Sequence, residues 1–191
     1  MSDGLKRKSN RTGGIRMTIK FKVIVTGSSE SDEEVYLIEE KDILKGEQYQ
    51  TNLGLDFKLQ YKVIGEKSVN LILWLTKGDK HKEIKQNFYK GADGIVVLFD
   101  TSAEENIDQI IGRIQELRES SPSSSILLIG RNIRNRMNQI VEEYTKQLIR
   151  EGKVEKKTDL NIDFYDVLDE KGVGPAILDF FARKLLSRTD Y

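Results

Sequence analysis

Apolar positions alternate along the chain between short β-branched runs and longer stretches with helical spacing. Compact apolar runs, the pattern of buried strands, occur at residues 21–26, 55–63, 68–75, 94–100, 126–130 and 162–167. Helices are predicted at residues 30–45, 79–90, 102–120, 137–151 and 174–187. Gly65 and Glu66 separate the second and third runs, which are therefore predicted to pair as an antiparallel hairpin. The rest of the alternation predicts an α/β fold: a mostly parallel six-stranded sheet with one antiparallel edge strand and helices on both faces.

The amino-terminal segment differs in composition from the rest. Its cations outnumber its acids, and it has few apolar residues to bury. Such a segment cannot offset the entropy of ordering it, so we expect a basic disordered tail at residues 1–18. The folded domain is predicted at residues 19–187, with a short tail at 188–191. The basic tail is suited to weak contact with an acidic surface.

Charge and composition exclude several classes of function. The chain has 31 Lys and Arg against 31 Asp and Glu, and this zero net charge disfavours a nucleic-acid-binding protein. The lack of cysteine excludes disulfides, thiolate zinc sites, cysteine nucleophiles and prenylation, and one histidine excludes a histidine-rich metal site. No apolar run has the length of a membrane span and no signal-peptide pattern is present. We therefore expect a cytoplasmic protein with no stable membrane anchor.

Three stretches resemble the small GTPases of the Ras superfamily, most closely the Rab branch. Residues 49–57 (YQTNLGLDF) resemble switch I and the strand after it. Residues 71–78 (LILWLTKG) resemble the strand that leads into the DxxG motif, and residues 88–100 (FYKGADGIVVLFD) the Rab stretch YYRGAxGIxxxYD. The resemblance extends over about residues 20–187. It implies a Ras-like fold of the P-loop GTPase type.

The positions that match the phosphate-binding loop of this family carry acids. Of the pattern GxxxxGK[ST], Gly27 is kept, but Asp32 replaces the second glycine. Glu33 replaces the phosphate-binding lysine, and Glu34 the hydroxyl that binds magnesium. Two unit charges about 8 Å apart interact by about 2 kcal/mol at an effective dielectric constant of about 20, so these acids would repel a phosphate chain. Acids are also ordinary stabilising residues in the first turn of a helix, and this simpler interpretation remains open.

The magnesium and water-positioning motifs of the family are altered as well. Asn52 matches the switch I threonine that binds magnesium, and Leu75 matches the aspartate of DxxG. Gly78 is kept, whereas Asp79 matches the glutamine that orients the attacking water. These replacements remove the side chains through which the family holds magnesium.

The base-recognition motifs show the same loss. The NKxD motif, whose aspartate accepts hydrogen bonds from guanine, corresponds to Arg131, Asn132, Ile133 and Arg134. Arg134 has only donors to offer, so it would face the donors of the base. Asp169 lies in the segment that matches the SAK-type loop.

An aromatic set remains as a candidate binding surface. Phe57, Trp74 and Phe88 match the cluster with which Rab proteins bind effectors. One interpretation is that the rings pack within the domain and cover the sheet edge. The other is that Trp74, the only tryptophan, anchors a protein partner.

Together these observations predict a pseudo-GTPase: a Rab-like, non-catalytic binding or scaffold module that uses no cofactor. Its protein partner would bind the surface that matches the switch and interswitch regions. The alternative is a divergent small GTPase that still binds GTP or GDP with magnesium in an unusual way. A receiver-type phosphoacceptor domain is a third possibility, which the hairpin and residues 88–100 disfavour. A nucleotide titration separates the first two.

Overall fold

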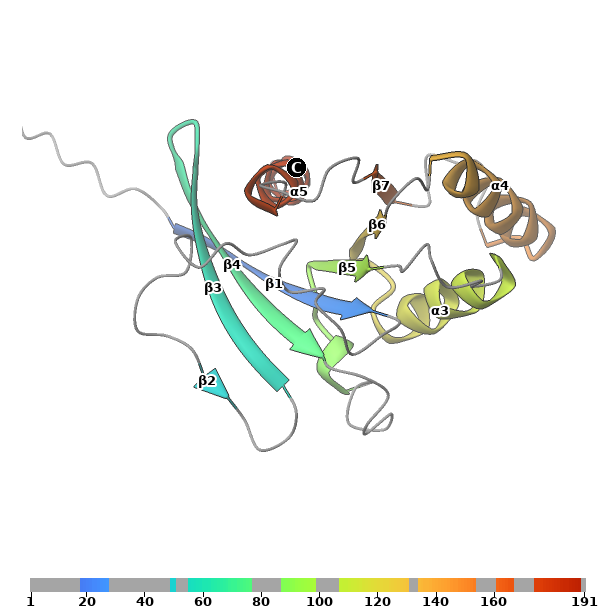
Figure 1. The fold of residues 1–191 in the computed structure, drawn as a ribbon, viewed down its shortest axis with the longest axis horizontal. Helices are drawn as coiled ribbons and strands as arrows, with labels where there is room; N and C mark the ends of the chain where they lie inside the picture. The colour runs from blue at the N-terminus through green and yellow to red at the C-terminus, as the bar shows by residue number, and fades with distance from the viewer. Residues whose placement is uncertain are drawn as a thin grey trace, which may run out of the picture.

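A seven-stranded sheet forms the centre of the part of the chain that the computed structural model describes (Figure 1). The described residues are 18–27, 49–50, 55–76, 87–98, 107–130, 134–153, 161–166 and 174–189. The strands are β1 (Thr18–Gly27), β2 (Tyr49–Gln50), β3 (Leu55–Ile64), β4 (Lys67–Thr76), β5 (Gly94–Leu98), β6 (Ser125–Gly130) and β7 (Ile162–Asp166). The long helices are α3 (Ile107–Ser120), α4 (Arg134–Arg150) and α5 (Gly174–Ser187).

The strand order is β2-β3-β4-β1-β5-β6-β7. From β4 to β7 every pair is parallel, whereas β3 runs antiparallel to β4. The hairpin turn includes Gly65, whose φ of 60° is a left-handed conformation that glycine adopts at little cost. The predicted α/β fold class and the hairpin are confirmed. The two-residue strand β2 pairs antiparallel with β3 at the edge and was not predicted, because two residues carry no periodic pattern.

Helices cover both faces of the sheet, as predicted. On one face, α5 packs against inward-facing residues of β1, β3, β4, β5 and β6; this core includes Phe21, Val23, Val25, Leu71, Leu73, Leu75, Val96, Phe181 and Leu185. On the other face, α3 and α4 pack against Ile24, Ile95, Val97, Ile126 and Leu128. Figure 1 shows α5 apart from α3 and α4. Strands β5 and β6 are buried throughout, which explains their uninterrupted apolar sequences.

The α5 helix approaches the sheet closely at Gly94. A Cβ atom at this position would lie 2.6 Å from Cε1 of Phe181 and 3.3 Å from Cδ2 of Leu185. Cβ atoms essentially never lie this close to other heavy atoms, so a side chain at this position would force the Phe181 ring to move. The absence of a side chain at Gly94 therefore lets Phe181 fill the space over β5.

A polar network lies at the amino-terminal ends of β6 and β7. The Arg118 guanidinium, on the last turn of α3, donates to the carbonyl oxygens of Pro122, Ser124 and Asn161. Asn161 has a φ of 51°, and its side-chain amide donates to Ser124 O at 3.2 Å. Burial lowers the pKa of Arg118 from its ordinary value, and the nearby Tyr144 partly offsets this effect. The network joins the end of α3 to the start of two strands.

Some element boundaries differ from the predictions. Strand β1 begins at Thr18, where the tail was predicted to end, because residues 18–20 pair with residues 68–70 of β4. Helix α4 begins at Arg134, three residues before the predicted start. The tail at 1–17, the helix predicted at 30–45 and most of the helix predicted at 79–90 lie outside the described residues. Within the described part, none of the helices is long and apolar enough to cross a membrane.

Candidate functional site

The carboxyl ends of the parallel strands meet at one edge of the sheet, where ligands of such folds bind. Gly27 ends β1 at this edge and lies in register with Leu98 of β5. Leu75, near the end of β4, lies in register with Val25 of β1. Its side chain is only 4 % exposed and belongs to the core under α5. The position that matches the magnesium-binding aspartate therefore holds a packed apolar side chain.

This geometry does not fit a magnesium site at Leu75. Magnesium takes oxygen ligands, directly or through its bound waters, and a leucine side chain supplies neither a ligand nor a hydrogen-bond acceptor for such a water. Within the described ranges, no group of three or more His, Cys, Asp or Glu side chains lies close enough together to hold a metal ion. The described residues thus provide no side-chain cage for magnesium at this edge.

The structure describes few of the other positions of the altered nucleotide motifs. Arg134 is the first residue of α4, but its side chain is not described. Nine further positions lie outside the described residues: Asp32, Glu33, Glu34, Asn52, Gly78, Asp79, Arg131, Asn132 and Asp169. Their predicted roles remain predictions.

The three aromatic residues singled out from the sequence do meet. Phe57 on β3 and Trp74 on β4 are direct cross-strand partners, and their ring centroids are 4.1 Å apart with an interplanar angle of 73°. The Phe88 ring, on a helical turn at residues 87–89, lies 5.6 Å from Trp74 at 44°. All three side chains are half-buried. We call Phe57, Trp74 and Phe88 the aromatic cluster; edge-to-face and tilted contacts of this kind are favourable.

Lys22 contacts the aromatic cluster, a contact that was not predicted from the sequence. Its ammonium group lies 5.0 Å from the centroid of the Trp74 ring, within the range of a cation–π interaction. The same group donates to the carbonyl oxygen of Lys90 at 2.9 Å. Lys22 thus joins the ring of Trp74 to the chain just after Phe88. The only sequence signal was the alternation of β1, which places Lys22 on the same face as Ile24 but does not indicate its contacts.

Asp93 holds this corner of the sheet together. One of its carboxylate oxygens accepts from the backbone N–H of Lys22 at 2.7 Å, and its own N–H donates to Lys22 O at 2.9 Å. Burial lowers the pKa of Lys22 below its ordinary value of 10.5, and the Asp93 carboxylate offsets part of this effect. The segment that carries Phe88 is thereby fixed to β1.

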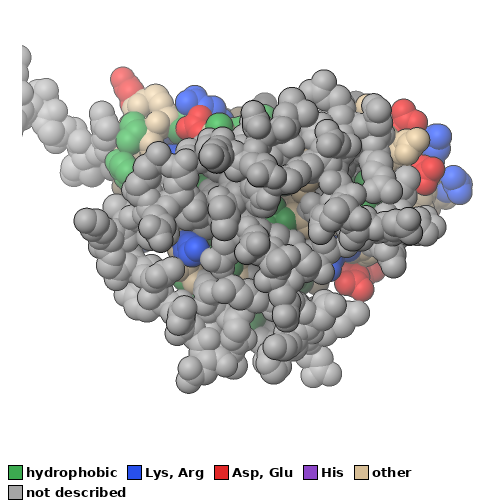
Figure 2. Space-filling view, in the orientation of Figure 1, with side chains coloured by type: hydrophobic (Ala, Val, Ile, Leu, Met, Phe, Trp, Pro, Cys, Tyr) green, Lys and Arg blue, Asp and Glu red, His purple; other side chains and the backbone are tan. Residues whose placement is uncertain are grey.

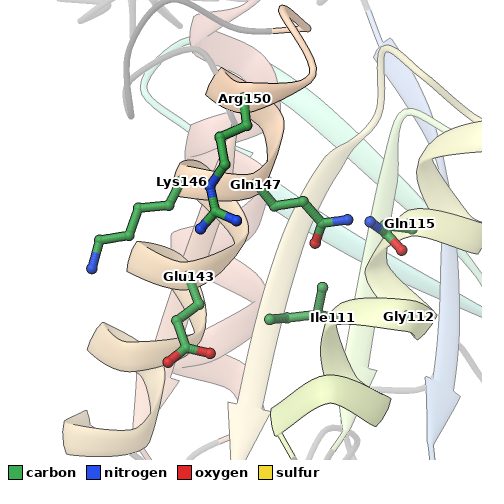
Figure 3. Close-up of a pocket in the computed structure, with 7 residues that line it drawn as sticks. All are labelled: Ile111, Gly112, Gln115, Glu143, Lys146, Gln147 and Arg150. Atoms are coloured by element: carbon green, nitrogen blue, oxygen red, sulfur yellow. The ribbon is translucent and has the colours of Figure 1, made fainter.

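A groove lies between α3 and α4 (Figure 3). This groove has a volume of about 510 Å³. Figure 3 shows Gln115 of α3 and Gln147 of α4 pointing toward one another, with Glu143 and Arg150 further along α4. Gln147 Nε2 already donates to Glu151 at 3.0 Å. The groove is lined mainly by long polar side chains at the surface.

The sheet order, the hairpin and the helices on both faces define the class of the protein as a Ras-like α/β fold. A family model described as the Ras family matches residues 22–167, from within β1 to the residue after β7. Because the match covers most of the 191 residues, the chain belongs to the Ras family.

Proposed function

We propose that this Ras-family chain is a Rab-like pseudo-GTPase, a non-catalytic module that binds a protein partner through the aromatic cluster. The observation that carries the proposal is the burial of Leu75, which stands where the family has an aspartate that serves magnesium. A hydrated cation at this position would have to displace the Leu75 side chain, which would open the core under α5.

The sequence supports the same proposal at the other nucleotide motifs. Acids at Asp32, Glu33 and Glu34 would repel a phosphate chain, and Arg134 would meet the guanine donors with donors of its own. Loss of one such group is compatible with nucleotide binding in a modified site. Loss of the metal, phosphate and base contacts together leaves little to hold GTP or GDP, so the proposal includes no cofactor.

The aromatic cluster is suited to binding a protein. A few residues supply most of the binding free energy in many protein interfaces, and tryptophan is enriched among them. Here the Trp74 ring is already held by contacts to Phe57, Phe88 and Lys22. Binding of a partner therefore loses little conformational entropy at these rings, because they are already held in place. Without a γ-phosphate to order and release neighbouring loops, this surface would be available constitutively.

The remaining parts of the proposal follow from composition. The protein would act in the cytoplasm, bind no nucleic acid and have no stable membrane anchor. Residues 1–18 would make weak, salt-sensitive contact with acidic surfaces. The alternative function, a divergent GTPase that holds GTP or GDP with magnesium, makes the opposite prediction for nucleotide content.

Two measurements on the purified full chain test the proposal. Denaturation followed by analysis of the released bases should yield no guanine nucleotide. In cell extracts, Trp74→Ala should lose partners that the unmodified chain retains, while Phe180→Ala should keep them. Phe180 is a matched control because it is 40 % exposed on α5, away from the aromatic cluster. Stoichiometric guanine nucleotide, or an unchanged partner set in Trp74→Ala, would contradict the proposal.

A further inference from the structure

Strand β3 buries Ile64 at its end, but it turns Tyr61 and Val63 toward the outside and two of its polar side chains toward the core. Lys58 and Gln60 are 6 % and 1 % exposed, whereas Tyr61 and Val63 are both 46 % exposed. An amphipathic strand normally buries its apolar face, so the informative feature is this inversion. Figure 2 shows hydrophobic side chains at the exposed end of the β3–β4 hairpin, at the upper left.

The exposed apolar side chains form one continuous strip with the aromatic cluster. Residues two apart on a strand share a face, so Leu59, Tyr61 and Val63 lie on the same face as Phe57. On β4, Ile72 lies opposite Leu59 in the register. We call Leu59, Tyr61, Val63 and Ile72 the hairpin strip. It extends from the aromatic cluster to the hairpin turn, away from the carboxyl edge of the sheet.

Cations border this surface along β1. Lys22 lies in register with Ile72, and Lys20 with Asn70 on the same face. Lys20 is exposed, and Lys90 is exposed beside the Lys22 ammonium group. The nearby carboxylate, Asp93, is engaged by the backbone N–H of Lys22. The surface therefore combines an apolar strip with a positive border on one side.

The spacing of the rows fits a helix. Successive rows on a strand lie about 6.7 Å apart, close to the rise of about 6 Å between helix positions i and i+4. The four rows that begin at Phe57 and end at Val63 span about 20 Å, the length of a helix of about 13 residues. A partner strand would pair with a sheet edge through its backbone, whereas these side chains stand on the face of the sheet, where helices pack.

We infer that the hairpin strip and its lysine border form a docking surface for an acidic amphipathic helix of a partner protein. Apolar side chains of that helix would cover the aromatic cluster and the hairpin strip, and carboxylates along its flank would face Lys20 and Lys22. This inference rests on the proposed function, because it takes the aromatic cluster as one end of a protein-binding surface. It names the kind of partner and adds a second, separable half to the site.

A display library of random 16-residue peptides, selected on the full-length protein, provides the test. We expect enriched peptides to carry apolar residues three and four positions apart with Asp or Glu on one flank. The double variant Tyr61→Ser/Val63→Ser and the variant Lys20→Glu should each weaken their binding by about tenfold or more. Replacing the flanking acids of a peptide with lysines should restore its binding to Lys20→Glu. Lys146→Glu, in the groove between α3 and α4, should change binding by less than about twofold.

The outcomes distinguish this inference from the proposed function. Peptides that lose binding in Trp74→Ala but not in Tyr61→Ser/Val63→Ser or Lys20→Glu would refute the inference and leave the aromatic cluster as a binding site. Peptides that bind all variants equally, or no enrichment at all, would contradict both. Enrichment of basic peptides or of alternating strand patterns would also overturn the inference. Sedimentation with vesicles of phosphatidylcholine and phosphatidylserine that depends on Tyr61 and Val63 would assign the surface to lipid instead. Lys20, Tyr61, Val63 and Lys146 are exposed, whereas Trp74 is half-buried, and unchanged unfolding midpoints would show that each variant is folded.

Discussion

The ammonium group of Lys22 lies 5.0 Å from the centre of the Trp74 ring and donates to Lys90 O. Two adjacent strands and the segment after Phe88 are joined by this one side chain. Because Trp74 is the only tryptophan, its fluorescence reports on this site alone. The arrangement makes both the stability of the site and its binding open to measurement.

Lys22→Met should change the pH dependence of stability in the alkaline range. Burial lowers the pKa of Lys22 below 10.5 in the folded chain, so the unfolded chain binds more protons in the window just below 10.5. The free energy of unfolding of the unmodified chain should therefore rise relative to Lys22→Met as the pH increases through this window. Urea unfolding of both proteins, followed by Trp74 emission, measures the difference. A difference that falls with increasing pH would mean that the folded state favours the charged form of Lys22.

Leu75→Asp should destabilise the protein and should not create a magnesium site. The leucine is 4 % exposed under α5, so a carboxylate there would be buried without a partner. We expect a loss of about 3 kcal/mol or more in the free energy of unfolding. Leu75→Met, which keeps the volume, should cost less than about 1.5 kcal/mol. Thermal unfolding with and without magnesium and GDP provides the measurement, and stabilisation of Leu75→Asp by the pair would contradict the account.

Gly94→Ala should destabilise the packing of α5 on the sheet. Its Cβ would meet the Phe181 ring at 2.6 Å, and overpacking of this kind costs about 1–3 kcal/mol. Gly112→Ala is the matched control, since nothing lies within 4 Å of its added Cβ and the helix gains about 0.5–1 kcal/mol. Chemical unfolding should show a lower free energy of unfolding for Gly94→Ala and a higher one for Gly112→Ala. Equal effects would show that the contact between Gly94 and Phe181 is looser than described.

Arg118→Met should weaken the junction between α3 and the start of β6 and β7. The carbonyl oxygens of Pro122, Ser124 and Asn161 would each lose the Arg118 donor, at an expected cost of about 2–4 kcal/mol, although Ser124 O keeps the Asn161 amide and Asn161 O keeps the Ile126 N–H. Lys146→Met, on the exposed face of α4, should change stability by less than about 0.5 kcal/mol. Hydrogen exchange should accelerate first at the amides of residues 124–126 in Arg118→Met. Retention of full protection there would show that the network contributes little.

Much of the fold could be predicted because its signals are local. Buried positions are apolar and recur with the period of their strand or helix. The apolar runs of β5 and β6 and the apolar stripes of α3 and α5 could therefore be found in the sequence. The hairpin followed from Gly65 at a turn between two runs. By contrast, β2 depends on pairing with β3 alone, and two residues carry no period.

The site was predictable only in part. The aromatic cluster was found through the resemblance of Phe57, Trp74 and Phe88 to family positions, and the structure brings these rings together. The role of Lys22 depends on a contact with Lys90, 68 positions away along the chain, which no local pattern encodes. The inversion of β3 was hidden for a similar reason, because alternation shows two faces of a strand but not which face the rest of the molecule covers.

Calorimetric titration of the purified chain with GDP and with a non-hydrolysable GTP analogue, in the presence of magnesium, tests the central claim most directly. We predict no saturable heat with either ligand at micromolar protein, since the buried Leu75 offers no support for the metal and the acids and arginines proposed to replace the phosphate and base contacts would disfavour both. Saturable binding in the micromolar range that requires magnesium would contradict the account and identify the chain as a nucleotide-binding member of its family.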